Sequence, residues 1–420
     1  MSGNLPVNAA RIAEDIDGLA RLTEPGRPWT RRVFSPLFLE GRAYIEARMR
    51  AAGLETRIDA AGNLIGRRAG GGDARAVLML GSHSDTVPDG GRFDGVAGVV
   101  AALEVARSLA ERGVGLAHDL EVVDFLAEEV SPFGVSCIGS RGMTGQMPET
   151  WLTRRNESGA LGDALASVGG DPAAILRLSP PEIAAFLELH IEQGRVLERE
   201  GNDIGLVTGI VGISRYEILV EGRPDHAGTT PMDSRADALV AASDLVLRVR
   251  DEALRLSRKS SHFAATVGEF AMAPNAANVV PGRVRLLIDA RAERRPDMEA
   301  FATWLDQAAG NVASERGVAI SPPARVSDSQ PVACDPHLLE VLAKAAGAAG
   351  VTTRPLASGA GHDAAWIARV APAAMIFVPS RGGRSHAPDE WTDNDAIARG
   401  AAVLFEAVIA LDATPEMTEA

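Results

Sequence analysis

Cysteine is scarce in this chain, and its scarcity excludes two classes of protein. The 420 residues include only Cys137 and Cys334, which lie far apart in the sequence. A disulfide-stapled secreted fold needs several cysteine pairs, and a cysteine zinc site needs closely spaced ones. We therefore expect two reduced thiols and no cysteine metal site.

Long apolar runs and runs of basic residues are also lacking. No stretch approaches the roughly 20 apolar residues that span a bilayer, and the first residues show no basic region followed by an apolar one. The formal net charge of -14 at pH 7 disfavours nucleic acid or an anionic membrane as the main partner. We expect a cytoplasmic protein without export signal, membrane anchor or nucleic-acid partner.

The chain is long enough, and at 46% hydrophobic residues apolar enough, for two domains. Short continuous apolar runs predict buried strands at four places, and apolar residues at three- and four-residue steps from Val96 to Leu109 predict a helix. Asp335 and Pro336 predict the start of another helix. The four predicted strands are residues 76–82, 120–127, 183–191 and 373–380. The expected class is α/β, with a mixed central sheet flanked by helices over residues 1–212 and 329–420.

Residues 213–328 follow a different pattern. Apolar and polar residues alternate from Ser214 to Val220 as in a strand with one buried face, and a helix follows. Two more strands, a second helix and a last strand are predicted after it, at 262–271, 283–291, 298–308 and 318–321. This β-α-β-β-α-β order predicts a smaller α+β domain inserted into the larger one, with its helices on one face of the sheet.

Five side chains that can bind metal ions end or follow the predicted strands of the larger domain. They are His83, Asp94, Glu129, His190 and His386. Open α/β sheets form their sites at such strand ends, and two metal ions about 3.5–4 Å apart share a bridging carboxylate in many hydrolases. Each residue alone could be an ordinary polar loop residue, but their common position predicts a two-metal site.

Asp94 is the candidate for the bridging carboxylate, because it closes the loop that begins at His83. Asp85 points to the same side of an extended chain as His83 and could orient its imidazole. The neighbours Glu128 and Glu129 face different ways, so one can bind metal while the other holds a water. The plain alternatives are that Asp94 caps the following helix and that the two glutamates form a solvated strand end.

The motifs around these residues resemble those of a known enzyme family. In order along nearly the whole chain they are Gly62-Asn63-Leu64, GSHSDTVPDGGRFDGVAG, AEEVSPFGVSCIGSRGMTG, LELHIEQGRVLE, HAGTTPM, PNAANVVPG, SGAGHDA and VPSRGGRSHAPDE. The set is similar to the metal-dependent amidohydrolase and peptidase family that includes N-carbamoyl-L-amino acid hydrolases, allantoate amidohydrolases and β-ureidopropionases. The match is most specific to this carbamoyl-cleaving branch.

The resemblance implies how the metal ligands divide. It assigns one ion to His83 and His190, the other to Glu129 and His386, and both to Asp94. Zinc, manganese, cobalt and nickel all accept imidazole and carboxylate ligands, so the identity of the two divalent ions stays open.

The resemblance also implies catalytic and substrate-binding roles. Glu128 would be the general base, moving a proton from the attacking water to the leaving nitrogen. His226 would donate a hydrogen bond to the tetrahedral oxyanion, although without the resemblance it reads as a capping or surface histidine. Arg291 with Asn278 suits bidentate capture of the substrate carboxylate, and the alternative is a surface pair between Arg291 and Asp289.

Gln193 and Gly359 would be further substrate contacts, whereas His362 and Asp363 would support the ligands from behind or cap a helix. In the family that the chain resembles, the inserted domain acts as a lid. The residues matching His226, Asn278 and Arg291 reach the active site from a neighbouring subunit or on lid closure. The resemblance therefore implies a homodimer built through the inserted domain.

The chain departs from the family pattern in three places. Glu128–Phe133 reads EEVSPF where the family commonly has EEGSRF, and Arg223-Pro224-Asp225 replaces smaller residues. Arg381 and Arg384 stand beside His386, where they either select a substrate with an extra carboxylate or pair with Asp389 or Glu390.

The predicted reaction is hydrolysis of an N-carbamoyl-L-amino acid to the amino acid, carbon dioxide and ammonia. The nearest alternatives are allantoate amidohydrolase and β-ureidopropionase, followed by an aminoacylase or dipeptidase. A non-catalytic binding protein is disfavoured, because Glu128 and all five ligands are present.

Overall fold

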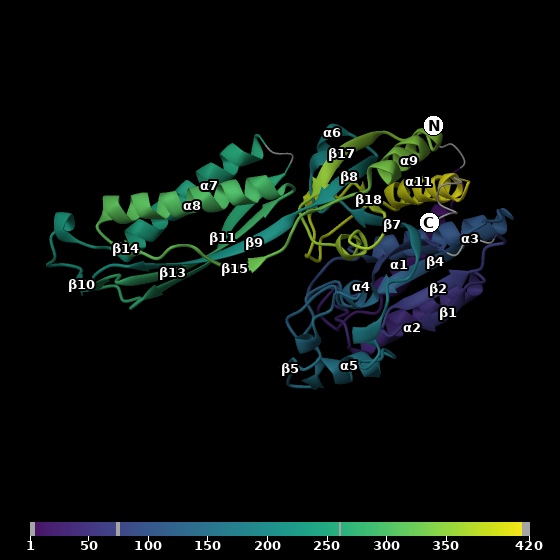
Figure 1. Cartoon of the computed structure of the whole chain (residues 1–420), viewed down its shortest axis with the longest axis horizontal. Helices are drawn as coiled ribbons and strands as arrows, with labels where there is room; N and C mark the ends of the chain where they lie inside the picture. Colours follow the sequence, from purple (N-terminus) through teal and green to yellow (C-terminus); the bar gives the residue numbers. More distant parts are fainter. Residues whose placement is uncertain (1–4, 73–75, 260–261, 414–420) are drawn as a thin grey trace. The chain divides into compact units, whose positions relative to one another are not determined.

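The computed structural model describes residues 5–72, 76–259 and 262–413, which form two compact units (Figure 1). The large unit contains residues 5–72, 76–208, 334–355 and 362–413, and the small unit contains Gly209–Ala333, apart from 260–261, and Leu356–Gly361. The ends of the predicted larger domain, at 1–4 and 414–420, lie outside the described residues, as do 73–75 and 260–261. None of the helices among the described residues is long and apolar enough to cross a membrane.

A nine-stranded mixed sheet forms the centre of the large unit. Its order is β1-β2-β4-β3-β7-β18-β8-β16, with β17 beside β8. The neighbours β4, β3, β7 and β18 are parallel, so their carboxyl ends meet at one edge of the sheet. The strands are β1 (Glu55–Ile58), β2 (Leu64–Arg68), β3 (Val77–His83), β4 (Asp119–Phe125), β7 (Ile183–Ile191), β8 (Ile204–Ile210), β16 (Val332–Ala333), β17 (Thr353–Ser358) and β18 (Ala373–Val378).

The four predicted buried strands are present, and β3, β7 and β18 are buried at every residue. Parallel strands covered on both faces need such continuous apolar runs. Two of them end earlier than predicted, β4 at Phe125 and β18 at Val378. Ala127 takes a left-handed φ of 56°, which turns the chain out of the β4 direction just before Glu128.

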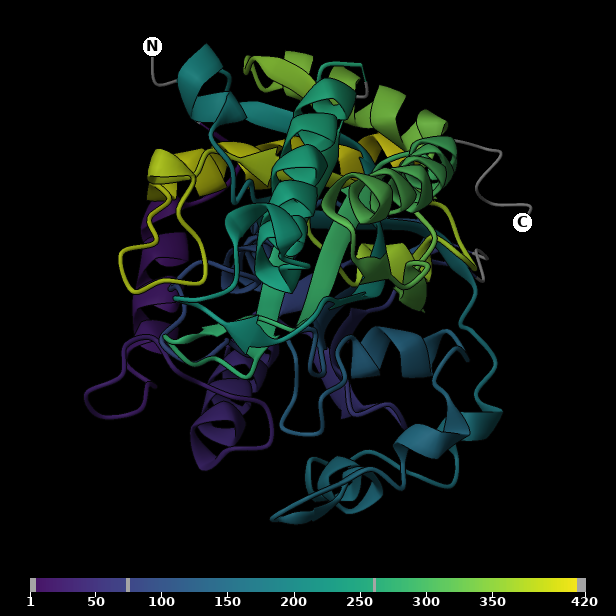
Figure 2. The same cartoon turned by 90° about the vertical axis from the view of Figure 1, so that its left-hand side faces the viewer.

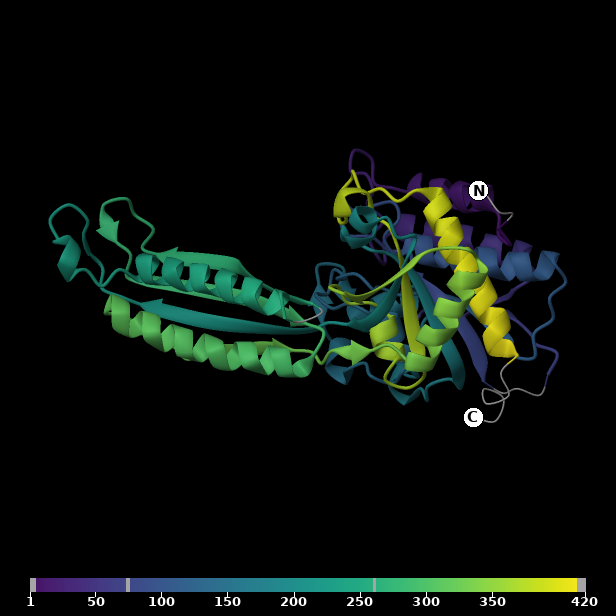
Figure 3. The same ribbon diagram turned by 90° about the horizontal axis from the view of Figure 1, so that it is seen from above.

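Helices cover the large sheet. α11 packs against both α3 and α9, and α1 packs against α3 and α11 (Figure 3). α3 begins at Val96 as the apolar spacing predicts, and Asp335 caps α9 by accepting a hydrogen bond from the Leu338 amide at 3.0 Å. The helices are α1 (Ala9–Ala20), α2 (Pro36–Ala51), α3 (Val96–Glu111), α4 (Ile138–Met143), α5 (Leu161–Ser167), α6 (Val196–Glu200), α9 (Pro336–Ala348), α10 (Ala364–Ile367) and α11 (Asn394–Asp412).

Short elements complete the large unit. They are the 3-10 turns η1 (Glu149–Trp151), η2 (Ile175–Arg177) and η4 (Arg381–Gly383) and the small hairpin of β5 (Arg155–Asn156) and β6 (Gly159–Ala160).

The small unit has an antiparallel sheet in the order β11-β13-β9-β14, with β15 beside β9. Its helices α7 and α8 lie side by side (Figure 2) and share one core with the sheet, in which Ile218, Leu286 and Phe301 are fully buried. The elements are β9 (Gly212–Glu221), β10 (Asp225–His226), η3 (Met232–Ser234), α7 (Ala238–Ser257), β11 (Phe263–Ala273), β12 (Val279–Val280), β13 (Arg283–Ala292), α8 (Arg295–Arg316), β14 (Ala319–Ile320) and β15 (Ala324–Asp328).

The α/β class is confirmed, with a large mixed sheet and a separate small antiparallel one. The β-α-β-β-α-β order is present as β9, α7, β11, β13, α8 and β14, and β15 is an additional strand. The small unit also includes Leu356–Gly361, which the predicted range 213–328 does not contain. The roles of the two parts, a catalytic domain and a lid or dimerisation domain, stay predictions.

Candidate metal centre

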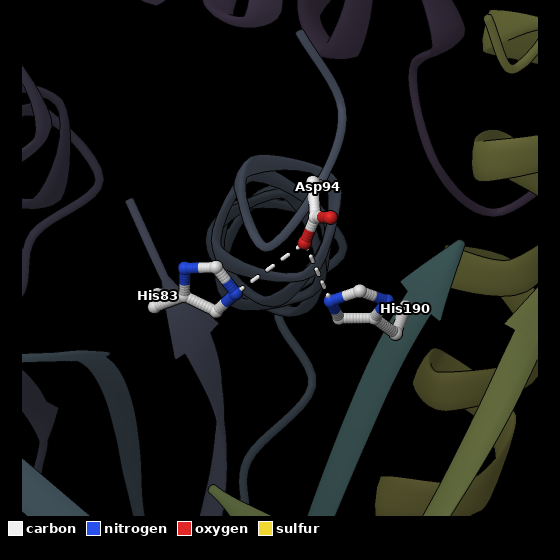
Figure 4. Close-up of side chains that lie close together, drawn as sticks. All are labelled: His83, Asp94 and His190. Carbon is white, nitrogen blue, oxygen red and sulfur yellow. Dashed lines mark ion pairs between the residues drawn. The ribbon is translucent and has the colours of Figure 1, made fainter. Parts of the chain in front are cut away.

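Three of the predicted ligands converge at the carboxyl edge of the parallel strands (Figure 4). His83 is the last residue of β3, His190 lies near the end of β7, and Asp94 precedes α3. The residue that caps α3 is Gly95, with a left-handed φ of 64°, so the interpretation of Asp94 as the helix cap is wrong. A Cβ at residue 95 would lie 2.4 Å from the His83 ring, which explains the glycine and frees the Asp94 carboxylate to face the histidines.

Both histidines present Nε2 to the same oxygen of Asp94. The distances to Asp94 Oδ1 are 3.6 Å from His83 and 3.2 Å from His190. The opposite ring nitrogens, Nδ1, lie 3.0 Å from the Asp85 carbonyl oxygen and 2.9 Å from the Ile191 carbonyl oxygen. A carbonyl only accepts, so Nδ1 carries the proton in each ring and Nε2 keeps the lone pair that a metal ion needs.

The second oxygen of Asp94 faces a different set of ligands. His386 Nε2 lies 3.3 Å from Asp94 Oδ2 and 3.1 Å from Glu129 Oε1. In each trio, His83-Asp94-His190 and Asp94-Glu129-His386, the ligand atoms lie within 4.8 Å of one another. The chain therefore holds two candidate metal-binding clusters that share Asp94.

The donor set fits two divalent ions. His83 Nε2 is buried and, among the described residues, has no hydrogen-bond partner, as expected of an atom that ligates a metal ion. Contacts with Asp94 first and with Glu129 second raise the pKa of the His386 imidazole to about 11. Burial alone would raise the pKa of Asp94, but the nearby imidazoles of His190, His386 and His83 hold it well below its usual range. The site thus favours positive charge.

Glu128 and Glu129 face different clusters, as their adjacency predicts. Glu128 Oε2 lies 3.5 Å from His83 Nε2, whereas Glu129 contacts His386. Burial is the largest influence on Glu128 and raises the pKa of its carboxyl well above the usual value. A buried carboxyl that holds its proton more tightly is suited to general acid-base work.

Asp85 contacts His83 chiefly through its backbone. Its carbonyl oxygen is 3.0 Å from His83 Nδ1, whereas its carboxylate is 3.5 Å away. The expected orienting contact to His83 therefore exists, but the carbonyl makes the shorter one.

Gln193 lies against the shared carboxylate. It follows β7 with a left-handed φ of 57°, and its Nε2 donates to Asp94 Oδ2 at 2.8 Å. Its predicted contact with substrate stays a prediction.

Ser385 and Glu390 belong to the site but escaped the sequence reasoning. Ser385 Oγ lies 2.8 Å from Asp94 Oδ2 and 2.8 Å from Glu390 Oε2, and Glu390 Oε1 accepts hydrogen bonds from two backbone amides beside Asp94. Burial first, and the Asp94 charge second, raise the pKa of Glu390 to about 7. The only signal in the sequence is an acid four residues after His386, which the sequence analysis treats as a partner for Arg381 or Arg384.

His362 and Asp363 lie behind the ligands. The His362 ring centroid is 4.6 Å from that of His190, and Asp363 accepts a 2.6 Å hydrogen bond from Ser140. Asp363 stands at the N-cap position of α10, but its side chain makes no capping hydrogen bond there.

No disulfide joins Cys137 and Cys334, and both residues are buried. Cys137 Sγ lies 3.9 Å from Glu128 Oε1, a contact that the sequence did not indicate.

Comparison with known proteins identifies the family. The family model described as "Peptidase family M20/M25/M40" matches residues 79–410. The chain belongs to this family. It is 39% identical over 408 residues to an N-carbamoyl-L-amino-acid amidohydrolase of Paenarthrobacter aurescens, covering 96% of this chain and 98% of the relative.

Other relatives place the chain in the hydantoinase/carbamoylase branch of the family. An allantoate amidohydrolase of Bacillus subtilis is 36% identical, covering 90% of this chain and 91% of the relative, and a ureidoglycolate hydrolase of Arabidopsis thaliana is 33% identical, covering 96% and 87%. The crystal structure of a hydantoinase/carbamoylase family amidase from Burkholderia multivorans superimposes with a TM-score of 0.89 at 34% identity, covering 98% of this chain and all of the other.

The remaining predicted residues of this M20 chain lie at two separate places in the small unit. The His226 ring nitrogen Nδ1 accepts hydrogen bonds from two following amides, and the Asn278 carbonyl accepts one from the Ala227 amide. Arg291 donates to the Gly359 carbonyl at 3.0 Å and pairs with Asp289 at 2.8 Å. The alternative surface pair with Asp289 is therefore present, and the same guanidinium also contacts the Gly359 carbonyl.

Gly359 also has a packing reason to be glycine, since a Cβ there would lie 2.9 Å from the His262 ring. The two arginines beside His386 are paired outward, Arg384 with Asp389 at 2.8 Å and Arg381 with Asp393 at 3.0 Å. These pairs favour the structural alternative over selection of an extra substrate carboxylate.

Proposed function

We propose that the chain is a two-metal amidohydrolase that cleaves the carbamoyl C–N bond of an N-carbamoyl-L-amino acid. The observation that carries this is the pair of ligand trios sharing Asp94, with the buried carboxyl of Glu128 beside them. The amidohydrolase of Paenarthrobacter aurescens, whose name states this activity, supports the substrate class.

His83 and His190 would hold one divalent ion and Glu129 and His386 the other, with Asp94 contacting both. The residue types suit zinc, manganese, cobalt or nickel. When bound, such ions polarise a carbonyl and make water more acidic.

Glu128 would move the protons. Its Oε2 accepts one from the water that attacks the ureido carbon and delivers it to the terminal nitrogen as the C–N bond breaks. Ammonia leaves, and the remaining carbamate loses carbon dioxide to give the free amino acid.

Allantoate, ureidoglycolate and β-ureido acids are the nearest alternative substrates, since relatives at 36% and 33% identity are named for the first two. All carry a ureido group beside a carboxylate and would use the same centre. An aminoacylase or dipeptidase is further away, and a non-catalytic binding protein would need neither a complete ligand set nor Glu128.

We also propose a homodimer built through the small unit. His226 lies on β10, at the far end of that unit from the start of β9 (Figures 1 and 3). Arg291 lies eight residues along β13 from Arg283, which pairs with the last residue of β9. At about 3.4 Å a residue that is roughly 27 Å, so one copy cannot present both His226 and Arg291 to one small substrate.

The small unit offers a surface for the second copy. Val240, Leu247 and Leu254 recur every seven residues on α7 and are 49%, 59% and 44% exposed. β11 is the edge strand of the sheet, so its outer backbone groups are available for pairing. An exposed apolar stripe beside an open sheet edge suits a self-complementary interface.

An ammonia-release assay tests the reaction. Protein loaded in turn with each of the four metals is given N-carbamoyl-L-amino acids, allantoate, ureidoglycolate, β-ureido acids, N-acyl amino acids and dipeptides. We expect ammonia and free amino acid fastest from a carbamoyl amino acid. Ammonia from none of the ureido compounds would refute the proposed reaction, and a preference for allantoate would reassign the substrate.

A further inference from the structure

Glu390 is a buried carboxyl group that joins two loops far apart in the sequence. It is 1% exposed, and its Oε1 accepts hydrogen bonds from the Phe93 amide at 2.9 Å and the Asp94 amide at 3.1 Å. Its Oε2 lies 2.8 Å from the hydroxyl of Ser385, which is itself 2.8 Å from Asp94 Oδ2. One side chain thus reaches both the backbone and, through Ser385, the carboxylate of the shared ligand.

The two joined loops each supply a ligand. Asp94 comes from the loop between β3 and α3, and His386 from the loop between β18 and α11. Neither residue lies within a helix or strand, so no backbone ladder fixes its position. Contacts between the loops must therefore set the positions of Asp94 and His386 relative to each other.

The rest of the interface is built around the Glu390 carboxylate. A Cβ at Gly91 would lie 1.9 Å from Glu390 Oε1, so residue 91 leaves the space that the carboxylate fills. The Phe93 ring packs edge-on against Trp391 at 5.4 Å, and the Trp29 indole donates to the Pro388 carbonyl at 3.2 Å. Phe93 and Trp391 thus join the same two loops beside Glu390, and Trp29, from the segment between α1 and α2, contacts the second loop as well.

We propose that Glu390 is a positioning residue that fixes Asp94 so that its two oxygens face the two ligand trios. The inference rests on the proposed two-metal function. Groups that orient metal ligands typically contribute 10- to 100-fold to metal affinity. Glu390 touches neither ion nor substrate in this role and acts through Ser385 and the Asp94 loop.

The choice of variants follows from the hydrogen bonds. Glu390→Ala removes all of them, whereas Glu390→Gln keeps an oxygen for the two amides and an NH2 group that can donate to Ser385. Gly91→Ala keeps the Glu390 carboxylate but forces it out of its position, because the added methyl group occupies the same space. Asp389→Asn is the matched control, because Asp389 is the neighbouring acid but is exposed and pairs only with Arg384 among the described residues.

The test is a calorimetric titration of metal-free protein with Co²⁺, together with the visible absorption spectrum of the Co²⁺-loaded protein. We expect Glu390→Ala and Gly91→Ala to weaken Co²⁺ binding by about 10- to 100-fold and to change the spectrum. We expect Glu390→Gln to restore most of the affinity, and Asp389→Asn to match the unmodified chain. In turnover, kcat should fall more than KM rises.

Co²⁺ binding by Glu390→Ala with unchanged affinity and spectrum would overturn the role of Glu390. If that variant does not fold, Gly91→Ala decides, and unchanged binding by it would overturn the role equally. Absence of Co²⁺ binding by the unmodified chain would instead refute the metal centre itself, and the role of Glu390 with it.

Discussion

Asp94 and Glu128 show how single residues acquire their chemistry from their surroundings. Gly95 turns the chain so that the Asp94 carboxylate faces three imidazoles, those of His83, His190 and His386. Glu128 and Glu129 are equally little exposed and differ in the side chains that they meet, His83 for the first and His386 for the second. Their proposed roles differ because the backbone directs the two adjacent side chains toward different clusters.

Replacing Glu128 by glutamine tests the base. We expect metal binding to be retained and the rate to fall by about 100-fold to 10,000-fold, because the amide cannot accept the proton. Ammonia release and Co²⁺ titration measure the two effects. Glu129→Gln is the contrast, since this variant should lose metal affinity as well as rate. Near-normal turnover by Glu128→Gln would show that Glu128 is not the general base.

Arg291→Lys tests carboxylate capture. A lysine keeps the charge but loses the planar fork, so we expect KM to rise by about 10-fold with a smaller change in kcat. Arg285→Lys is the control, because Arg285 lies on the same face of β13 and pairs with Glu217 and Glu269. An unchanged KM for Arg291→Lys would take Arg291 out of the site.

At the scale of elements, β15 is held to α8 by charged side chains. Arg295 donates to both oxygens of Asp328 at 2.7 and 2.9 Å, and Arg325 pairs with Glu299 at 2.9 Å. Most of β15 is exposed, so little apolar burial fixes it in place. The ion pairs therefore contribute to seating this strand beside β9.

This arrangement predicts a pH dependence. The Arg295 hydrogen bonds, as the largest cause, lower the pKa of Asp328 from 3.8 to about 2. Because the pKa of Asp328 is lower in the folded state, its carboxylate stabilises the fold above about pH 4, and this stabilisation is lost as the pH falls toward 2. Urea unfolding of the unmodified chain and of Arg295→Gln should therefore differ at pH 5 and converge toward pH 2. A difference independent of pH would contradict the assignment.

At the scale of the whole molecule, the homodimer predicts complementation between two inactive variants. Mixed dimers of Glu128→Gln and His226→Ala chains combine one intact large-unit site with one intact His226 from the other copy. If His226 acts in trans, randomly mixed subunits should recover about a quarter of the unmodified rate. No recovery after verified subunit exchange would place His226 in the site of its own copy.

The α7 stripe gives a second prediction at this scale. Leu247→Glu places a charge in the middle of the proposed interface, so we expect monomers by light scattering and a large loss of turnover. Val370→Glu is the control, since Val370 is 40% exposed on the large unit. A monomeric Leu247→Glu chain with full activity would show that the site needs no second copy.

Sequence reasoning named five candidate ligands that the structure brings together, because each follows or ends a strand and strand ends of a parallel sheet meet in space. It predicted β3, β7 and β18 because strands that are buried on both faces consist of consecutive apolar residues. It missed Ser385 and Glu390, whose partner Asp94 lies 291 residues before Ser385 in the chain. It also missed the contact of Arg291 with the Gly359 carbonyl, because Gly359 comes from a distant segment. Local patterns indicate burial and periodicity, whereas such long-range contacts are visible only in the folded chain.

The segment Leu356–Gly361 has a consequence for protein engineering. It belongs to the small unit, although residues 334–355, which lie between it and Ala333 in the sequence, belong to the large unit. Its Gly359 carbonyl receives Arg291, and its Ser358 carbonyl receives the Val211 amide at 3.1 Å. A chimera that exchanges 209–333 as one cassette would therefore pair a transplanted arginine with the host's own loop. Grafts between homologues should therefore carry both 209–333 and Leu356–Gly361, so that Arg291 keeps its own Gly359 partner.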